Sequence, residues 1–93
     1  MTALRVIKTD HFLTDLEEVV LFIAQDNMLA ALDMEQHIHN QVDSLADTNF
    51  PRRLGRVPGT LELVAHPNYI VLLQQTDTIV TALAVMHVAR QYP

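Results

Sequence analysis

Three arginines lie within five residues of one another, at Arg52, Arg53 and Arg56. They make up half of the six lysine and arginine residues in the chain. Guanidinium groups at such short spacing repel one another, so a negatively charged partner is expected to hold them together. Carboxylates and phosphates both match the planar fork of a guanidinium. The cluster is therefore predicted to bind a target. In the structural alternative it pairs with the acidic residues of the chain itself.

Other residues that could do chemistry are spaced unfavourably for a site. His37 and His39 are two positions apart in a predicted helix, so they point to different faces, whereas a helical metal pair needs a spacing of three or four residues. Glu17 and Glu18 also point apart, and form no acid–base pair. The chain has no cysteine and only two glycines, which leaves no thiolate chemistry and no phosphate-binding glycine loop. We therefore expect neither a metal nor a cofactor.

The charge of the chain is unevenly distributed. Net charge is −5 over 93 residues. The first fifty residues hold two basic residues against nine acidic ones, and the remainder holds four against two. Nucleic-acid binding draws most of its affinity from neutralised phosphates, so the acidic balance argues against general nucleic-acid binding.

Length and composition indicate one small domain in a reducing compartment. A chain of 93 residues with 49% hydrophobic residues can bury a modest core. No segment has the roughly 18 apolar residues of a membrane span, and charges interrupt the N-terminal segment, so no signal peptide is expected. The absence of cysteine fits the cytoplasm.

The first half of the chain predicts a strand and a helix. Residues 4–8 alternate loosely and are β-branched, as in a short strand. Thr9 or Asp10 then supplies a helix N-cap. One apolar stripe follows at steps of three and four residues: Phe12, Leu13, Leu16, Val19, Val20, Ile23 and Ala24. Asp26 and Asn27 are expected to end the helix, since asparagine tolerates the left-handed conformation of a C-cap.

A second helix and three strands complete the predicted elements. The second apolar stripe consists of Ala31, Met34, Ile38, Val42 (or Gln41) and Leu45. Its helix runs to about residue 47 and folds back on the first as an antiparallel hairpin. Residues 50–59 form a loop, and strands at 60–65, 69–75 and 78–88 form an antiparallel meander. The third strand is a nearly continuous apolar run, which favours the buried centre of the sheet. The fold class is therefore α+β, as one domain over residues 1–93.

Four segments carry a family resemblance. They are Asp15–Ala24, Pro51–Arg56, Pro58–Val64 and Val85–Pro93. In this order and spacing they resemble the DLEEI…YIA, P.LGR, G.REL and VLH.RR..P motifs of the ParE/RelE superfamily of plasmid-stabilisation toxins. The resemblance covers nearly the whole chain. It implies a helical hairpin packed on one face of a twisted, mostly antiparallel four-stranded sheet, with the first strand at its edge or centre.

The resemblance also implies a function. Members are toxins of type II toxin–antitoxin systems, and a cognate antitoxin wraps each toxin in a higher-order complex. ParE-like members poison DNA gyrase, whereas RelE-like members cleave mRNA in the ribosome. This chain departs from the family at Leu61, Leu73, Gln74 and Ala89, where members often carry tyrosine or arginine. The lost cations and the acidic net charge favour a ParE-like inhibitor of gyrase, and more a protein-level inhibitor than an enzyme.

The resemblance names candidate site residues under each reading. A gyrase inhibitor would bind its target through Arg52, Arg53, Arg56 and Arg90. A ribosome-dependent endonuclease would use Arg56, His87, Arg90 and Tyr92, since arginine, histidine and tyrosine can activate a ribose hydroxyl and stabilise a phosphorane. In the structural alternative, His87 caps the sheet and Tyr92 packs at its edge. A third reading is a decayed toxin that only binds its antitoxin.

Three leucines remain outside the two apolar stripes. They are Leu21, Leu29 and Leu32. They are expected to meet the antitoxin, which in this family adds a helix or a strand to the toxin, or to close a self-association interface. The sequence leaves both alternatives open.

Overall fold

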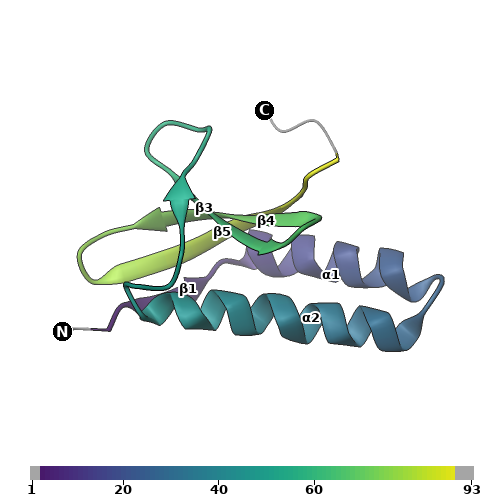
Figure 1. The fold of residues 1–93 in the computed structure, drawn as a ribbon. Helices are drawn as coiled ribbons and strands as arrows, with labels where there is room; N and C mark the ends of the chain where they lie inside the picture. Colours follow the sequence, from purple (N-terminus) through teal and green to yellow (C-terminus); the bar gives the residue numbers. More distant parts are fainter. Residues whose placement is uncertain (1–2, 90–93) are drawn as a thin grey trace.

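The computed structural model describes residues 3–89 of the chain (Figure 1). The elements, in chain order, are β1 (Arg5–Lys8), α1 (Asp10–Ala24), α2 (Met28–Asp43), a short 3-10 helix η1 (Ser44–Ala46), β2 (Arg53–Leu54), β3 (Leu61–His66), β4 (Tyr69–Gln75) and β5 (Ile79–His87). Both helices cover one face of the sheet, and the turn between them projects past the end of the strands (Figure 1). The predicted α+β class and the order of its elements are confirmed.

The sheet has five strands in the order β1-β5-β4-β3-β2. β1 lies at one edge and runs parallel to β5. The pairs β4–β5, β3–β4 and β2–β3 are antiparallel. The expected four strands are present, and β2 is a fifth in the segment expected to be a loop. Its two residues, Arg53 and Leu54, are too few to leave an alternating pattern in the sequence.

Each helix begins at a residue whose side chain caps its first turn, and the sequence predicts one of these two caps. Thr9 Oγ1 accepts a hydrogen bond of 3.0 Å from Phe12 N, which confirms Thr9 as the N-cap of α1. Asn27 was expected to end α1 in a left-handed conformation, and this is wrong. Its φ is −157°, and its side chain accepts from Ala30 N at 3.0 Å. Asn27 therefore begins α2, because an asparagine oxygen can satisfy a free N–H of the first helical turn.

The core lies between the helical hairpin and one face of the sheet. It is formed by Leu4, Phe12, Leu16, Ile38, Val42, Leu45, Leu63, Ala65, Tyr69, Val71, Leu73, Val80 and Ala82. Both predicted apolar stripes contribute to it. Leu13, which was placed in the first stripe, is 42% exposed instead. No helix within residues 3–89 is long and apolar enough to cross a membrane.

Candidate target-binding site

A buried carboxylate holds the segment Arg52–Arg56, here called the arginine segment, in place. Glu62 lies on β3 opposite Arg53 and is 1% exposed. Its Oε1 accepts a hydrogen bond of 3.0 Å from Arg53 Nε, and its Oε2 accepts one of 3.2 Å from Arg56 N. A buried carboxylate is tolerated only when it is paired and hydrogen-bonded. Glu62 therefore fixes both the β2 strand and the backbone that follows it.

Arg52 ties the same segment to the end of the helical hairpin. Its guanidinium donates to the carbonyls of Leu45 and Asp47 at 3.3 and 2.6 Å and to Gln75 Oε1 at 2.9 Å. Its Nε donates to Phe50 O at 3.0 Å. Burial lowers the pKa of Arg52, and the carboxylate of Asp47 opposes that shift. The structural alternative thus describes Arg52 well, although its acceptors are mainly carbonyls rather than the acids that were expected.

The outer side of the segment combines positive charge with an apolar side chain. Leu54 is 85% exposed, the most exposed of the large hydrophobic residues described. It lies between Arg53, whose side chain is 54% exposed, and the exposed Arg56. Gly59, with a φ of 82°, turns the chain back toward β3 in a conformation that favours glycine. Leu54, Arg53 and Arg56 are thus all exposed along this segment.

A cavity of about 280 Å³ lies beside the segment. Arg52, Arg53 and Glu62 supply its polar side, and Phe50 and Val64 are among its apolar residues. Such a cavity suits an apolar or acidic side chain of a bound protein. We therefore take β2, the turn after it and this cavity as the candidate site.

The other predicted site residues lie elsewhere. His87 pairs with Tyr69 across β4 and β5, and their ring centroids are 5.0 Å apart. Tyr69 in turn pairs with His66 on β3. Glu62, which holds the backbone of Arg56, lies four residues from His66, or about 13 Å along the strand. The structure therefore does not bring His87 beside Arg56. The remaining candidates, Arg90 and Tyr92, lie outside the described residues.

Four aromatic rings form a row at the His87 end of the sheet. His37 contacts His66, His66 contacts Tyr69, and Tyr69 contacts His87, at centroid distances of 6.1, 5.9 and 5.0 Å. His37 also approaches the carbonyl of Ala65 at 2.6 Å. His37 nevertheless remains exposed to solvent. Within residues 3–89, no three histidine, aspartate or glutamate side chains are grouped as a metal site.

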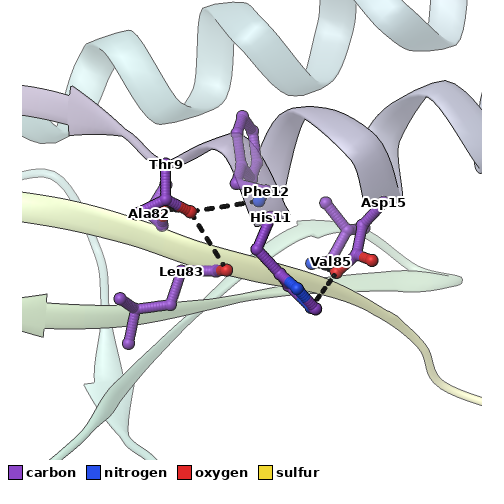
Figure 2. A network of polar contacts seen from close by, with 7 residues as sticks. All are labelled: Thr9, His11, Phe12, Asp15, Ala82, Leu83 and Val85. Carbon is purple, nitrogen blue, oxygen red and sulfur yellow. Dashed lines mark hydrogen bonds and ion pairs between the residues drawn. The ribbon is translucent and has the colours of Figure 1, made fainter.

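The edge of β5 is completed by side chains where β1 ends. β1 pairs with β5 only from Ile79 to Ala82. Beyond that point, Thr9 Oγ1 donates to the carbonyls of Ala82 and Leu83, and Asp15 Oδ2 accepts from Val85 N at 3.0 Å (Figure 2). These contacts fasten the start of α1 to β5.

Three residues that matter to these contacts and surfaces were not predicted from the sequence: Glu62, Leu54 and Asp15. A single acid within the apolar strand Leu61–His66, close to three arginines, was a signal for Glu62. Leu54 carried no signal, because its exposure depends on the two-residue strand β2. Asp15 carried no signal either, because its carboxylate reaches β5 only in the folded chain.

Known proteins share this arrangement of two helices on a mixed sheet. One solved structure, the chromosomal ParDE toxin–antitoxin system from P. aeruginosa, superposes with a TM-score of 0.80 at 19% identity, covering 92% of this chain and 97% of the other. A search of curated proteins found no match. A family model, the ParE toxin of the type II toxin–antitoxin system parDE, matches residues 6–92. The chain belongs to the ParE toxin family, which implies an antitoxin partner.

Proposed function

We propose that this toxin arrests bacterial growth by binding and inhibiting DNA gyrase through the segment Arg52–Arg56, and that its cognate antitoxin neutralises it. The observation that carries the proposal is Leu54, which is 85% exposed between two arginines. An RNA target calls for dense cations and stacking aromatic rings, whereas a leucine beside guanidiniums suits an apolar recess with acidic neighbours on a protein. The net charge of −5 supports the same choice.

The runner-up is the ribosome-dependent endonuclease. Its four candidate residues would have to converge on one ribose phosphate. Arg56 and His87 lie near opposite ends of the sheet, which weighs against this reading. If it holds, His87→Ala should abolish mRNA cleavage without affecting antitoxin binding.

The antitoxin, we propose, covers the turn of the helical hairpin. Five apolar side chains of that region are between 50% and 74% exposed: Leu21, Phe22, Met28, Leu29 and Leu32. An exposed apolar patch of this kind marks a protein interface. The hairpin carries no lysine or arginine, since none occurs between Lys8 and Arg52. A partner with apolar and basic side chains is therefore favoured over a second copy of this acidic hairpin.

The test is growth arrest after controlled induction, with two readouts. Pulse labelling shows whether DNA or protein synthesis stalls first, and a reporter plasmid reports supercoiling. Gyrase inhibition predicts early loss of DNA synthesis with altered plasmid topology. Unchanged topology with early arrest of translation would reject gyrase as the target.

Two matched leucine variants separate the two surfaces. Leu54→Ser should lose toxicity and still bind the antitoxin. Leu29→Ser, with a 74% exposed side chain on the hairpin, should remain toxic and resist neutralisation. Full neutralisation of Leu29→Ser would exclude the hairpin turn as the antitoxin site, and undiminished toxicity of Leu54→Ser would exclude the arginine segment.

A further inference from the structure

A second cavity, of about 240 Å³, lies between α1 and the ends of β4 and β5. Asp15, Glu18 and Phe22 line it from the helix, and Tyr69 and His87 line it from the sheet. It is at the opposite end of the sheet from the arginine segment, and the proposed gyrase-binding surface does not use it.

The cavity has two carboxylates on one wall. Asp15 and Glu18 are three residues apart on α1 and therefore lie on the same face. Asp15 approaches the ring of His11 at 3.3 Å, and Glu18 forms no ion pair within residues 3–89. The helical hairpin contributes no lysine or arginine. Among the described residues, the wall is thus an anionic surface that no lysine or arginine pairs with.

Tyr69 gives independent evidence that the cavity takes a polar group. The residue is 5% exposed, packed among the rings of His66 and His87. Its hydroxyl makes no hydrogen bond with the described residues. Every fully buried side-chain nitrogen or oxygen within residues 3–89 has a partner, so this hydroxyl reaches solvent, and the cavity that Tyr69 lines gives it that access. A solvent-accessible hydroxyl without a protein partner can bond to a polar group that enters the cavity.

We propose that this cavity binds the guanidinium group of an arginine from a protein partner. Two carboxylates can accept the paired N–H groups of a guanidinium, and the Tyr69 hydroxyl can accept a further one. Phe22, which is 58% exposed, offers a ring face on which a planar cation stacks. A lysine ammonium would use the charge of the wall but neither the paired geometry nor the stacking.

The position of the cavity favours an arginine within an extended segment over a free small molecule. Beyond Ala82, β5 has no neighbouring strand on its β1 side among the described residues. Val85 and His87 lie on this part of β5 and also line the cavity. Thr9 and Asp15 take the backbone groups of this edge only as far as Val85. A chain that passes along β5 beyond Val85 can place alternate side chains in adjacent pockets. The inference goes beyond the proposed function, since it does not depend on gyrase.

Binding can be measured with two peptides that differ in charge alone. The probe is acetyl-Gly-Ala-Arg-Ala-Gly-amide, titrated into the ¹⁵N-labelled full-length chain. Saturable shifts of the Val85 and His87 amide signals are expected. The same peptide with citrulline in place of arginine keeps the shape and loses the charge, and should bind at least roughly tenfold more weakly. Equal binding of the two peptides would overturn the proposal.

Two variants and one control assign the site. Tyr69→Phe keeps the ring and removes the hydroxyl, and should weaken binding roughly three- to tenfold. Glu18→Gln should weaken it at least as much. Asp26→Asn, an exposed acid outside the cavity, should leave it unchanged. Unchanged affinity in both cavity variants would reject this site. Free arginine binding as tightly as the peptide would reject a protein partner.

Discussion

Asp15 Oδ2 accepts a hydrogen bond of 3.0 Å from the backbone N–H of Val85, seventy residues further along the chain. The contact lies where β1 has ended and β5 continues. A strand N–H that lacks a neighbouring strand must find another acceptor or remain hydrated. The helix carboxylate takes the place of the missing strand, and α1 is thereby fixed at one position along β5.

Asp15→Ala should therefore lower the free energy of unfolding by about 1–2 kcal/mol, because it leaves a part-buried N–H without its acceptor. Asp15→Asn keeps an oxygen in place and should lose less. Urea unfolding measures both. Glu17→Ala, an exposed acid on the same helix, is the control and should change stability by no more than about 0.5 kcal/mol. An equal loss in the control would show that Asp15 acts only through helix charge.

Thr9 also holds the start of α1 against β5, close to the contact that Asp15 makes (Figure 2). Its hydroxyl accepts from Phe12 N and donates to the carbonyl of Ala82 at 3.1 Å. Thr9→Val keeps the shape and removes both bonds, and should cost about 1–2 kcal/mol. Thr9→Ser keeps the hydroxyl and should retain most of the stability in thermal unfolding. A stable Thr9→Val variant would contradict the role of this hydroxyl.

The sequence predicts the elements that depend on local patterns. Both apolar stripes, the Thr9 cap and the strand Tyr69–Gln75 follow from periodicity and turn residues, and the structure confirms them apart from the exposed Leu13. The position of β1 was left open between edge and centre. It pairs with β5, seventy-four residues away at Arg5 and Ile79, and no local pattern reports so distant a partner.

The candidate site was less predictable for the same reason. The arginine cluster was visible from spacing alone, but the different roles of its members were not. Arg52 differs in role from Arg53 and Arg56, because its guanidinium donates to the backbone carbonyls of Leu45 and Asp47. Only the fold brings these carbonyls to it. Tyr69 was seen only as the first residue of a strand. Its cavity exists because α1 crosses the end of β4 and β5, which is a tertiary relationship.

His39 should make the protein less stable in acid. Burial lowers the pKa of His39 from its ordinary value of 6.5, and the nearby charge of Lys8 lowers it further, while Asp43 and Glu35 oppose the shift. Lys8 Nζ lies 2.9 Å from His39 Nδ1, a contact that requires an unprotonated acceptor. The folded state thus binds a proton less well than the unfolded state. This stability is present above the ordinary pKa and is lost as pH falls from about 6.5 through the lowered pKa.

The measurement is the free energy of unfolding between pH 7.5 and 5, compared among three proteins. His39→Asn replaces the ring acceptor by an amide oxygen and should flatten the dependence in this range. His11→Asn removes a histidine whose side chain is 74% exposed and should keep the dependence of the parent. A parent whose stability rises toward pH 5 would contradict the sign of the His39 contribution.

Glu62 should be required for an ordered arginine segment. Glu62→Gln weakens the charge-assisted bond from Arg53 and perturbs the one from Arg56 N. Charge-assisted hydrogen bonds are about twice as strong as neutral ones, so a loss of about 1–2 kcal/mol is expected. Hydrogen exchange should also become faster at Arg56 N–H. Glu35→Gln on α2 is the control. Unchanged exchange at Arg56 would show that Glu62 does not hold the turn.

Arg52 and Arg56 should respond oppositely to replacement by glutamine. Arg52 binds the carbonyls that close the helical hairpin, so Arg52→Gln should cost about 1–3 kcal/mol of stability. Arg56 is exposed on the turn beside Leu54, so Arg56→Gln should cost less stability than Arg52→Gln and should reduce toxicity at equal protein level. Thermal unfolding and plasmid supercoiling after induction separate the two effects. Full toxicity of Arg56→Gln would remove that guanidinium from the target-binding surface, and a destabilised Arg56→Gln would show that its role is structural.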